Sequence, residues 1–507
     1  METEVHIRGE GLSTPSMVGV VRAEKALYCQ QPPFEPAISY PELAWPVEPS
    51  PSNPAYEGIR RLFGLLRCDA ANFGNRTWNP LGWLIKPGET VVLKPNLLRE
   101  SHPRDPQGWS YTLTHGSFIR AVADYVYIAL RGEGKVVVCD APQAESSFDQ
   151  ICKVLGLYAL RSYYREKGVQ FDLVDLRREE WESRDGVVTR RKELPGDPLG
   201  SVAFDLGASS RFLDHSGSGR YYGADYDAKE VNSHHHGGRH EYLLSRTVMQ
   251  AHVFINLPKL KTHKKTGITV ALKNLVGINA DKNWLPHHTE GGPELGGDEF
   301  PSTTRIREVE RAASKFLRQM ALRSPAIGGR VLALCKAASR PVFGDSGKVI
   351  RAGNWFGNDT AWRMCLDLNT ILFFGRLDST MAAPTNQPAM RYMALVDGIV
   401  AGEGDGPLDP DPVPAGLILG GTNPVAVDSA AAVLMGFDPD KIPLLSNAFR
   451  RNPYALARGT WKDVQLISDF EPWTGRLEDI QSCACFKFRP HFGWEGHIER
   501  MPATVPR

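Results

Sequence analysis

The sequence predicts an α/β fold: a mainly parallel sheet flanked by helices, with a polar insertion and an irregular, proline-rich N-terminal segment. Apolar runs typical of buried strands, at residues 90–94 and 135–139, alternate with segments whose apolar residues recur at helical spacing, at residues 116–131 and 148–167. Alternation of strands and helices with short links is typical of a parallel sheet covered by helices. The 507 residues exceed one ordinary core, which favours two domains or one large domain with insertions.

Composition divides the chain into five consecutive parts. Residues 1–55 are rich in proline and predict an extended segment that wraps around the rest, with one strand at residues 17–22. The other four parts are a first α/β half at 56–176, a polar insertion or flap at 177–250, a second α/β half with a loop rich in histidine and glycine at 251–478, and an irregular tail at 479–507.

The remaining elements follow in chain order. The first half begins with a helix at residues 56–67 and ends with a strand at residues 171–174, after a helix that Gly156 is expected to break. The second half begins with a strand at residues 253–257, and residues 266–276 fit either a helix or a strand. Further helices are predicted at 304–322, 331–337, 359–374 and 424–435, and further strands at 393–400, 416–419 and 464–467.

Charge and composition argue against several classes of protein. The net charge of +1 gives no overall field for nucleic acid or an anionic membrane, no apolar run approaches the roughly 18 residues of a membrane span, and the charged N-terminus does not look like a secretory signal. The eight cysteines are scattered without a CxxC, and the close pair Cys483 and Cys485 cannot close a metal site alone. These features predict reduced thiols and a soluble, cytoplasmic protein.

Polar side chains follow two of the predicted strands. Lys94 and Asn96 come at the end of the strand at residues 90–94, and Asp140 follows the strand at residues 135–139. Ligands of open α/β sheets bind outside the carboxyl ends of the strands, where a lysine can hold a phosphate or carboxylate and an acid can hold a metal. Each residue also has a structural interpretation: the lysine as one half of an ion pair, the aspartate as a helix cap.

The segment from residue 252 to residue 300 has the densest set of chemically active side chains. A basic cluster follows its apolar strand and continues into Lys273 and Asn274; its members are Lys259, Lys261, His263, Lys264 and Lys265. If these lysines converge, they form an anion site; the alternative is a solvated loop. The broad basic face with aromatic residues that nucleic acid requires is missing.

A glycine-rich loop closes this segment and predicts a metal site. It carries His287, His288, Asp298 and Glu299, a mixture of imidazole and carboxylate like that of an iron site, with glycines that let the backbone fold around a ligand. Four further histidines lie in a polar stretch for which a surface loop is the simpler interpretation: His234, His235, His236 and His240.

A second acidic group follows the predicted strand at residues 393–400. Glu403 and Asp405 stand in a turn rich in glycine, and Asp397 and Asp428 flank it in the sequence. Carboxylates in such a turn are oxygen ligands for a hard divalent cation, although the spacing is not that of an EF-hand and a plain turn has the same composition. The sequence lacks a GxSxG elbow, a P-loop and a GxGxxG fingerprint, which disfavours the common hydrolases, NTPases and nicotinamide enzymes.

Five blocks in order, spanning roughly residues 80–450, resemble the bacterial and archaeal family called domain of unknown function 362. They are VVLKPNLL, KVVVCDAP, INLPKLKTHKKTGITVALKNLVG, VDGIVAGEGDGPL and NPVAVDSAAAVLMGFDP. The resemblance implies an α/β protein without a defined activity. Some members carry an iron–sulfur ferredoxin module, but its cysteine cluster is absent here, so no intrinsic iron–sulfur cluster is expected. The motif positions are Lys94, Asp140, Lys259, Lys261, His263, Lys273, Asn274, Glu403, Asp405 and Asp428.

Three hypotheses follow for the function. The favoured one is an enzyme that acts on a phosphorylated or carboxylated small molecule with a divalent metal ion (Mg, Mn, Fe or Zn). Its candidate catalytic residues are His263, His288 and Asp140, its anion-binding residues Lys94, Asn96, Lys259, Lys261, Lys273 and Asn274, and its metal ligands His287, His288, Asp298, Glu299, Glu403 and Asp405. The alternatives are an iron-dependent redox protein and a non-catalytic ligand-binding protein.

Overall fold

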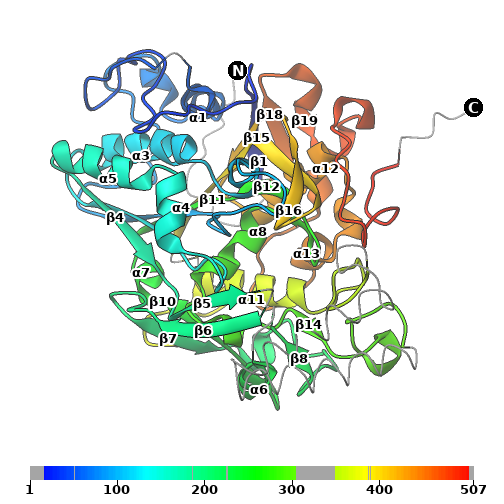
Figure 1. The fold of residues 1–507 in the computed structure, drawn as a ribbon. Coiled ribbons are helices and arrows are strands. Elements are labelled where there is room, and N and C mark those ends of the chain that lie inside the picture. Colours follow the sequence, from blue (N-terminus) through cyan, green and yellow to red (C-terminus); the bar gives the residue numbers. More distant parts are fainter. Residues whose placement is uncertain are drawn as a thin grey trace, which may run out of the picture.

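The fold was analysed on a computed structural model, which describes residues 16–50, 52–184, 187–223, 227–303, 349–385, 388 and 390–501. The chain forms the predicted α/β fold, with helices on both sides of one large sheet (Figure 1). The helices predicted at residues 304–322 and 331–337 lie outside the described residues. In the part of the chain that is described, no helix has both the length and the apolar character needed to cross a bilayer.

The large sheet is mixed, with a parallel centre. Its strands run in the order β19 (Gly475–Arg476), β18 (Gln465–Ser468), β1 (Met17–Arg22), β17 (Leu417–Gly421), β15 (Arg391–Asp405), β11 (Val253–Leu257), β2 (Thr90–Pro95), β3 (Lys135–Asp140) and β4 (Gln170–Asp175). The five strands from β15 to β4 are parallel, whereas β17 is antiparallel to both of its neighbours. The carboxyl ends of β11, β2 and β3 therefore share one edge of the sheet.

Helices cover both faces of this sheet, which explains its nearly continuous apolar strands. One face packs against α1 (Pro54–Leu65), α3 (Gly116–Leu130), α4 (Phe148–Val154) and α5 (Leu157–Glu166); the other packs against α8 (Ala271–Asn274), α11 (Ala361–Phe374), α12 (Pro424–Met435) and α13 (Pro443–Ala448). Side chains alternate between the two cores along a strand: Val91 and Leu93 lie in the first core, and Val92 lies in the second. Burial on both sides is characteristic of parallel sheets.

Smaller elements surround this frame. A ribbon of β12 (Lys259–His263), β13 (Gly267–Thr269) and β16 (Asp409–Val413) extends the sheet beside β15. Residues between β4 and β11 form β5 (Glu179–Arg184), β6 (Val187–Glu193), β7 (Ser201–Asp205), β8 (Tyr221–Tyr222), α6 (Ala228–His234), β9 (His235–His236), β10 (Arg239–Ser245) and α7 (Arg246–Met249). The remaining pieces are α2 (Trp109–Thr112) and β14 (His288–Thr289), which pairs with β8.

Most predicted elements are confirmed, and two are corrected. The helix at 148–167 is broken at Gly156, which has a left-handed φ of 65° and separates α4 from α5. The strand predicted at 393–400 is instead β15, 15 residues long, so the predicted turn around Glu403 and Asp405 is extended backbone paired with β16. Residues 266–276 are neither one helix nor one strand: β13 and α8 divide the segment.

Candidate functional site

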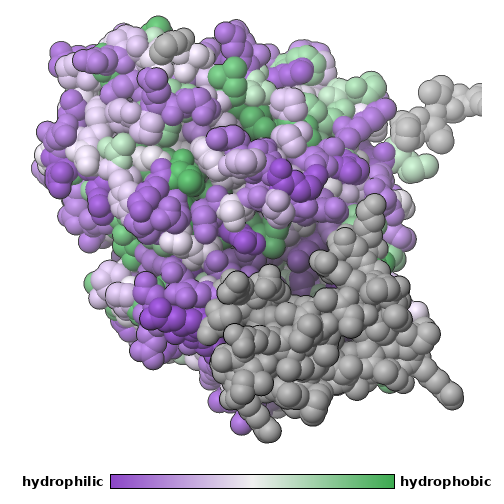
Figure 2. Space-filling model, in the orientation of Figure 1, coloured by the Kyte–Doolittle hydropathy of each residue, from purple (hydrophilic) through white to green (hydrophobic). Residues whose placement is uncertain are grey.

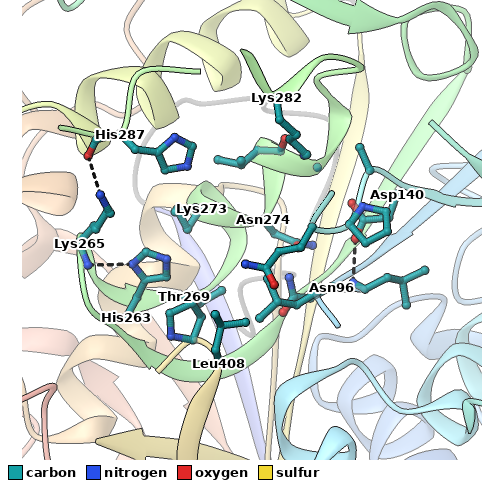
Figure 3. A pocket seen from close by; sticks show the side chains of 18 of the residues that line it. Asn96, Asp140, His263, Lys265, Thr269, Lys273, Asn274, Lys282, His287 and Leu408 are labelled. Carbon is teal, nitrogen blue, oxygen red and sulfur yellow. Dashed lines mark hydrogen bonds between the residues drawn. The ribbon is translucent and has the colours of Figure 1, made fainter. Parts of the chain in front are cut away.

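A cavity of about 240 Å³ opens at the carboxyl ends of β2 and β3 (Figure 3). Its other walls come from β12, β13 and α8, from the short 3-10 helices at Leu275–Ile278 and Lys282–Trp284, and from the loop that precedes β14. Nine of the predicted site residues line it: Lys94, Asn96, Asp140, Lys261, His263, Lys273, Asn274, His287 and His288. The sheet topology thus brings together residues that are almost two hundred positions apart in the sequence.

Lys94 and Asp140 form a buried ion pair at the base of the cavity. The Lys94 Nζ lies 2.7 Å from Asp140 Oδ1, and it donates hydrogen bonds to the Pro95 carbonyl at 2.8 Å and to Asn274 Oδ1 at 3.0 Å. The other carboxylate oxygen of Asp140 accepts the backbone N–H of Leu97 at 2.7 Å. Burial raises the pKa of Asp140 and lowers that of Lys94, and their pairing opposes both shifts. The two strand-end residues therefore hold each other in place.

The lysines of β12 occupy two different environments, although Lys259 and Lys261 have the alternate spacing that puts them on one face. Lys261 donates to Asn96 Oδ1 at 2.8 Å and to the Thr112 carbonyl, and it lines the cavity. Lys259 is outside the cavity, in a closed cluster where its Nζ lies 3.1 Å from Asp397 Oδ2 and 2.6 Å from the Tyr28 hydroxyl. Burial, followed by the charge of Lys259, lowers the pKa of Lys261 well below its usual value.

Positive charge outweighs negative charge around the cavity. Among the described residues, two carboxylates line it, Asp140 and Glu145, against six lysines: Lys94, Lys261, Lys264, Lys265, Lys273 and Lys282. Of these, Lys261, Lys264, Lys273 and Lys282 form no ion pair with any residue in the described ranges. Lys282 was missed by sequence reasoning; burial is the main cause that lowers its pKa to about 7, and its Nζ donates to the Val276 carbonyl at 3.2 Å.

Two neutral histidines face the cavity in opposite tautomers. The Nδ1 of His263 accepts the backbone N–H of Lys265 at 3.0 Å, which leaves the proton on Nε2. The Nδ1 of His287 lies 2.8 Å from the Leu285 carbonyl, which can only accept, so this nitrogen carries the proton and Nε2 keeps its lone pair. Burial, and next the charge of Lys273, lowers the pKa of both imidazoles well below the usual value. One ring thus offers a donor and the other an acceptor.

His288 lies at the rim of the same cavity, on β14. Its ring stacks on Tyr222 with the centroids 5.2 Å apart, and its Nδ1 is 3.4 Å from Lys265 Nζ. Lys265 also donates to the carbonyl of Ala352. His288 is therefore held by stacking on Tyr222 and by Lys265, and it lines the cavity together with the adjacent His287, which is labelled in Figure 3.

The two acids of the glycine-rich loop do not line the cavity. Asp298 is buried, and four donors occupy its oxygens: the backbone N–H groups of Thr289, Asp359 and Thr360 and the Thr360 hydroxyl, at 2.7 to 2.9 Å. It ties the loop to the start of α11, and burial is the main cause that raises its pKa to about 6. Glu299 accepts the backbone N–H of Gly291 at 3.2 Å.

Glu403 and Asp405 lie apart from the cavity as well. Glu403 accepts the backbone N–H of Arg489 at 2.9 Å, and Asp405 lies 4.0 Å from His491 Nε2. Both contacts join β15 to the C-terminal part of the chain. Only the neighbouring Pro407 and Leu408, at the tip of the ribbon, reach the cavity.

The structure does not gather the predicted metal ligands into one group. Within the described ranges, no three His, Cys, Asp or Glu side chains are placed so that they could hold a metal ion. His234 stacks on Trp284 with 3.5 Å between the centroids, and His235 and His240 are buried against each other in the β9–β10 hairpin, away from the cavity. The imidazole and carboxylate groups that line the cavity and could contact a metal ion there include His287 Nε2, Asp140 and Glu145.

Comparisons with known proteins confirm the family resemblance and give no function. The model of the family "Domain of unknown function (DUF362)" matches residues 210–433. No curated protein matches the sequence. A crystal structure of a protein from Thermotoga maritima shares 13% sequence identity over 45% of this chain, with a TM-score of 0.22; the match covers 38% of that protein, well under two thirds of its length.

Proposed function

We propose that this chain, whose residues 210–433 belong to the DUF362 family, is an enzyme that acts on a small phosphorylated or carboxylated molecule bound in the lysine-lined cavity. The observation that carries the proposal is the excess of lysines over carboxylates on the cavity wall, with four of these lysines unpaired among the described residues. An unpaired ammonium at a buried site is costly, and an anion with two charges would supply the missing counter-charge.

The size of the cavity and its two histidines support an enzyme over a simple binding protein. A volume of about 240 Å³ suits a molecule of metabolite size. Binding an anion requires only hydrogen-bond donors. The same cavity wall, however, carries a hydrogen-bond acceptor, the lone pair on His287 Nε2, as well as the N–H donor on His263 Nε2. A donor and a base facing one bound molecule are what proton transfer requires.

A divalent metal ion remains part of the proposal, but we expect it to bind together with the substrate rather than at a preformed set of protein ligands. Because a ready group of three ligands is absent from the described residues, we expect the ion to enter bound to the anionic substrate, with His287 Nε2 and Asp140 nearby. The alternative of an iron-dependent redox protein has less support, since Asp298 and Glu299 are outside the cavity. Removal of metal with EDTA should then weaken binding of a phosphate ester, as measured by calorimetry.

Oxalate is a direct probe of the lysine site, because it stays a dianion across neutral pH. We expect saturable binding by isothermal titration calorimetry, weakened about tenfold by Lys264→Gln or Lys282→Gln, since a charge-assisted hydrogen bond contributes roughly 1.5–3 kcal/mol. Lys153→Gln is the matched control, because Lys153 pairs with Asp149 on α4. The pKa of Lys282 near 7 predicts tighter binding at pH 6 than at pH 8.

Two results would count against this function. Absence of saturable oxalate or phosphate binding would remove the anion site. Equal weakening by Lys153→Gln and Lys282→Gln would mean that binding follows the overall charge of the protein rather than the cavity. The pH dependence adds an internal check, because Lys282→Gln should remove most of the difference between pH 6 and pH 8.

A further inference from the structure

Lys273 differs from the other buried lysines of this protein. Lys94, Lys259, Lys261 and Lys265 each donate to an oxygen of the protein, and so does the half-buried Lys282. Lys273 is only 9% exposed, yet its Nζ makes no hydrogen bond or ion pair with any residue in the described ranges, and it lines the cavity. Lys264 also lacks such a partner, but its side chain is half-buried at the rim.

The surroundings of Lys273 favour a neutral amine. Burial is the main cause that lowers its pKa, the buried Cys365 thiol opposes the shift, and the positive charge of Lys94 adds to it. A lysine that is desolvated next to another cation is the standard way to obtain an amine nucleophile near neutral pH. Within the described ranges, and in contrast to Lys94 and Lys259, no carboxylate pairs with Lys273 to hold it in the ammonium form.

The two neutral histidines lie around this amine. Among the neighbours that would lower the pKa of His263 and His287 when charged, Lys273 has the largest effect on both, so it lies close to each ring, and in Figure 3 its side chain lies between them. The Nε2–H of His263 can donate to a carbonyl oxygen, and the Nε2 of His287 can accept a proton from the attacking nitrogen. A neutral imidazole is able to polarise a carbonyl group in this way.

We propose that Lys273 forms a Schiff base with an anionic substrate that carries an aldehyde or ketone group, the lysines around the cavity holding the carboxylate or phosphate. This inference rests on the proposed function and narrows its substrate class. The Nζ lone pair forms the N–C bond while the carbonyl π pair moves to oxygen, which takes up one amine proton by way of His287. The nitrogen pair then forms C=N as the C–O bond breaks. The oxygen leaves as water with the second amine proton, so no oxidant or other co-reactant is needed.

Reductive trapping of the full-length protein tests this step. The protein is incubated with glyoxylate, or separately with glycolaldehyde phosphate, in the presence of sodium cyanoborohydride, and the modified lysine is identified by peptide mass spectrometry. We expect Lys273 to be labelled about tenfold faster than the exposed Lys153, with protection by oxalate, because a neutral amine is the reactive form. Lys273→Arg should lose the label, whereas Lys153→Arg, outside the cavity, should leave both the labelling of Lys273 and oxalate binding unchanged.

Failure of the Schiff-base inference and failure of the proposed function would give different experimental results. If oxalate binds but neither probe labels Lys273 above Lys153 and Lys264, the Schiff base is wrong and the anion site stands. If Lys273 is labelled and oxalate gives no protection, the amine is reactive but does not serve the anion site, which also overturns the inference. If oxalate does not bind at all, the proposed function is wrong. An unfolded Lys273→Arg variant would not obscure this, because labelling is measured on the wild-type chain.

Discussion

Buried carboxylates serve two different purposes in this protein. Asp140 pairs with a lysine at the cavity, whereas Asp298 and Asp428 accept backbone N–H groups away from it. Asp428, on α12, accepts from Ala271 at 2.7 Å and from Leu272 at 3.0 Å, and it thereby caps the first turn of α8, the helix that carries Lys273. An aspartate of this kind positions the site without lining it.

Asp428 should make stability depend on pH. Burial is the main cause that raises its pKa from 3.8 to about 8, which outweighs the two N–H donors. A raised pKa means that the folded state holds the proton more tightly. The contribution of this group is therefore fully present below the unfolded pKa and is lost as the pH rises towards 8, at about 1.4 kcal/mol per pH unit between the two pKa values.

Urea unfolding at pH 5, 6, 7 and 8 measures this contribution. We expect the free energy of unfolding to fall less steeply with pH in Asp428→Asn than in the wild type, because an amide does not titrate. Asp367 is another buried carboxylate, and burial is the main cause that raises its pKa to about 6. Asp367→Asn should therefore change the slope of unfolding free energy against pH only below about pH 6. Identical slopes in the wild type and Asp428→Asn would contradict the assignment.

The sequence could predict which residues lie at strand ends, but not which hydrogen bonds and ion pairs their polar atoms form. Lys94, Asn96 and Asp140 follow apolar strands, and the parallel topology brings them to one cavity. The sequence around Asp298 contains the same residue types as a metal site. The hydrogen bonds to the Asp298 carboxylate, however, come from backbone N–H groups and a hydroxyl group, and a sequence pattern does not reveal such donors. Lys282 was missed because an isolated lysine in a polar stretch carries no periodic signal.

At the scale of elements, short pieces rather than long helices shape the cavity. The strand β12 pairs with β13 and β15, and its register with β15 shifts between Lys259 and Lys261. Lys261 and His263 therefore line the cavity, whereas Lys259 does not. The 3-10 helix at Leu275–Ile278 packs directly on the Lys94–Asp140 pair. β15 was predicted too short because its glycines and acids resemble a turn, while pairing on both sides keeps it extended.

Gly277 should be essential for this packing. A Cβ at this position would lie 1.8 Å from Asp140 Oδ1 and 2.6 Å from Lys94 Nζ. Gly277→Ala should therefore push the ion pair apart, lower the free energy of unfolding by about 1–3 kcal/mol and weaken oxalate binding. Val276→Ala, in the same 3-10 helix, removes side-chain volume without a clash and serves as the control. Calorimetry and urea unfolding of both variants give the comparison, and equal oxalate affinities would show that the ion pair tolerates displacement.

The whole molecule, rather than the matched family segment, builds the candidate site. Residues 210–433 supply β11, β12, α8 and the His287 loop, but Lys94, Asn96 and Asp140 come from β2 and β3, which precede that segment. The N-terminal strand β1 also lies inside the sheet, between β17 and β18. The exterior is mostly hydrophilic on the face in Figure 2, in keeping with the ordinary charge balance of the sequence.

Tyr28 joins the segment after β1 to the strands β12 and β15. Its hydroxyl donates to Asp397 Oδ1 at 2.5 Å and accepts from Lys259 Nζ at 2.6 Å and from the backbone N–H of Val400 at 3.1 Å. The ring stacks on His115 with the centroids 4.1 Å apart. The N-terminal segment therefore contacts β12 at Lys259, two positions before Lys261 of the cavity.

Tyr28→Phe should reveal how strongly this segment is coupled to the sheet. The variant keeps the stacked ring but leaves the Val400 N–H without its acceptor and Lys259 with Asp397 alone, so we expect the free energy of unfolding to fall by about 1–3 kcal/mol. Tyr40→Phe is the matched control, because Tyr40 contacts Tyr56 and Arg60 through its ring only. Urea unfolding measures stability, and limited proteolysis within residues 23–50 reports local release. If the two variants were equally stable and equally resistant to protease, the hydroxyl of Tyr28 would have no role in joining the segment to the sheet.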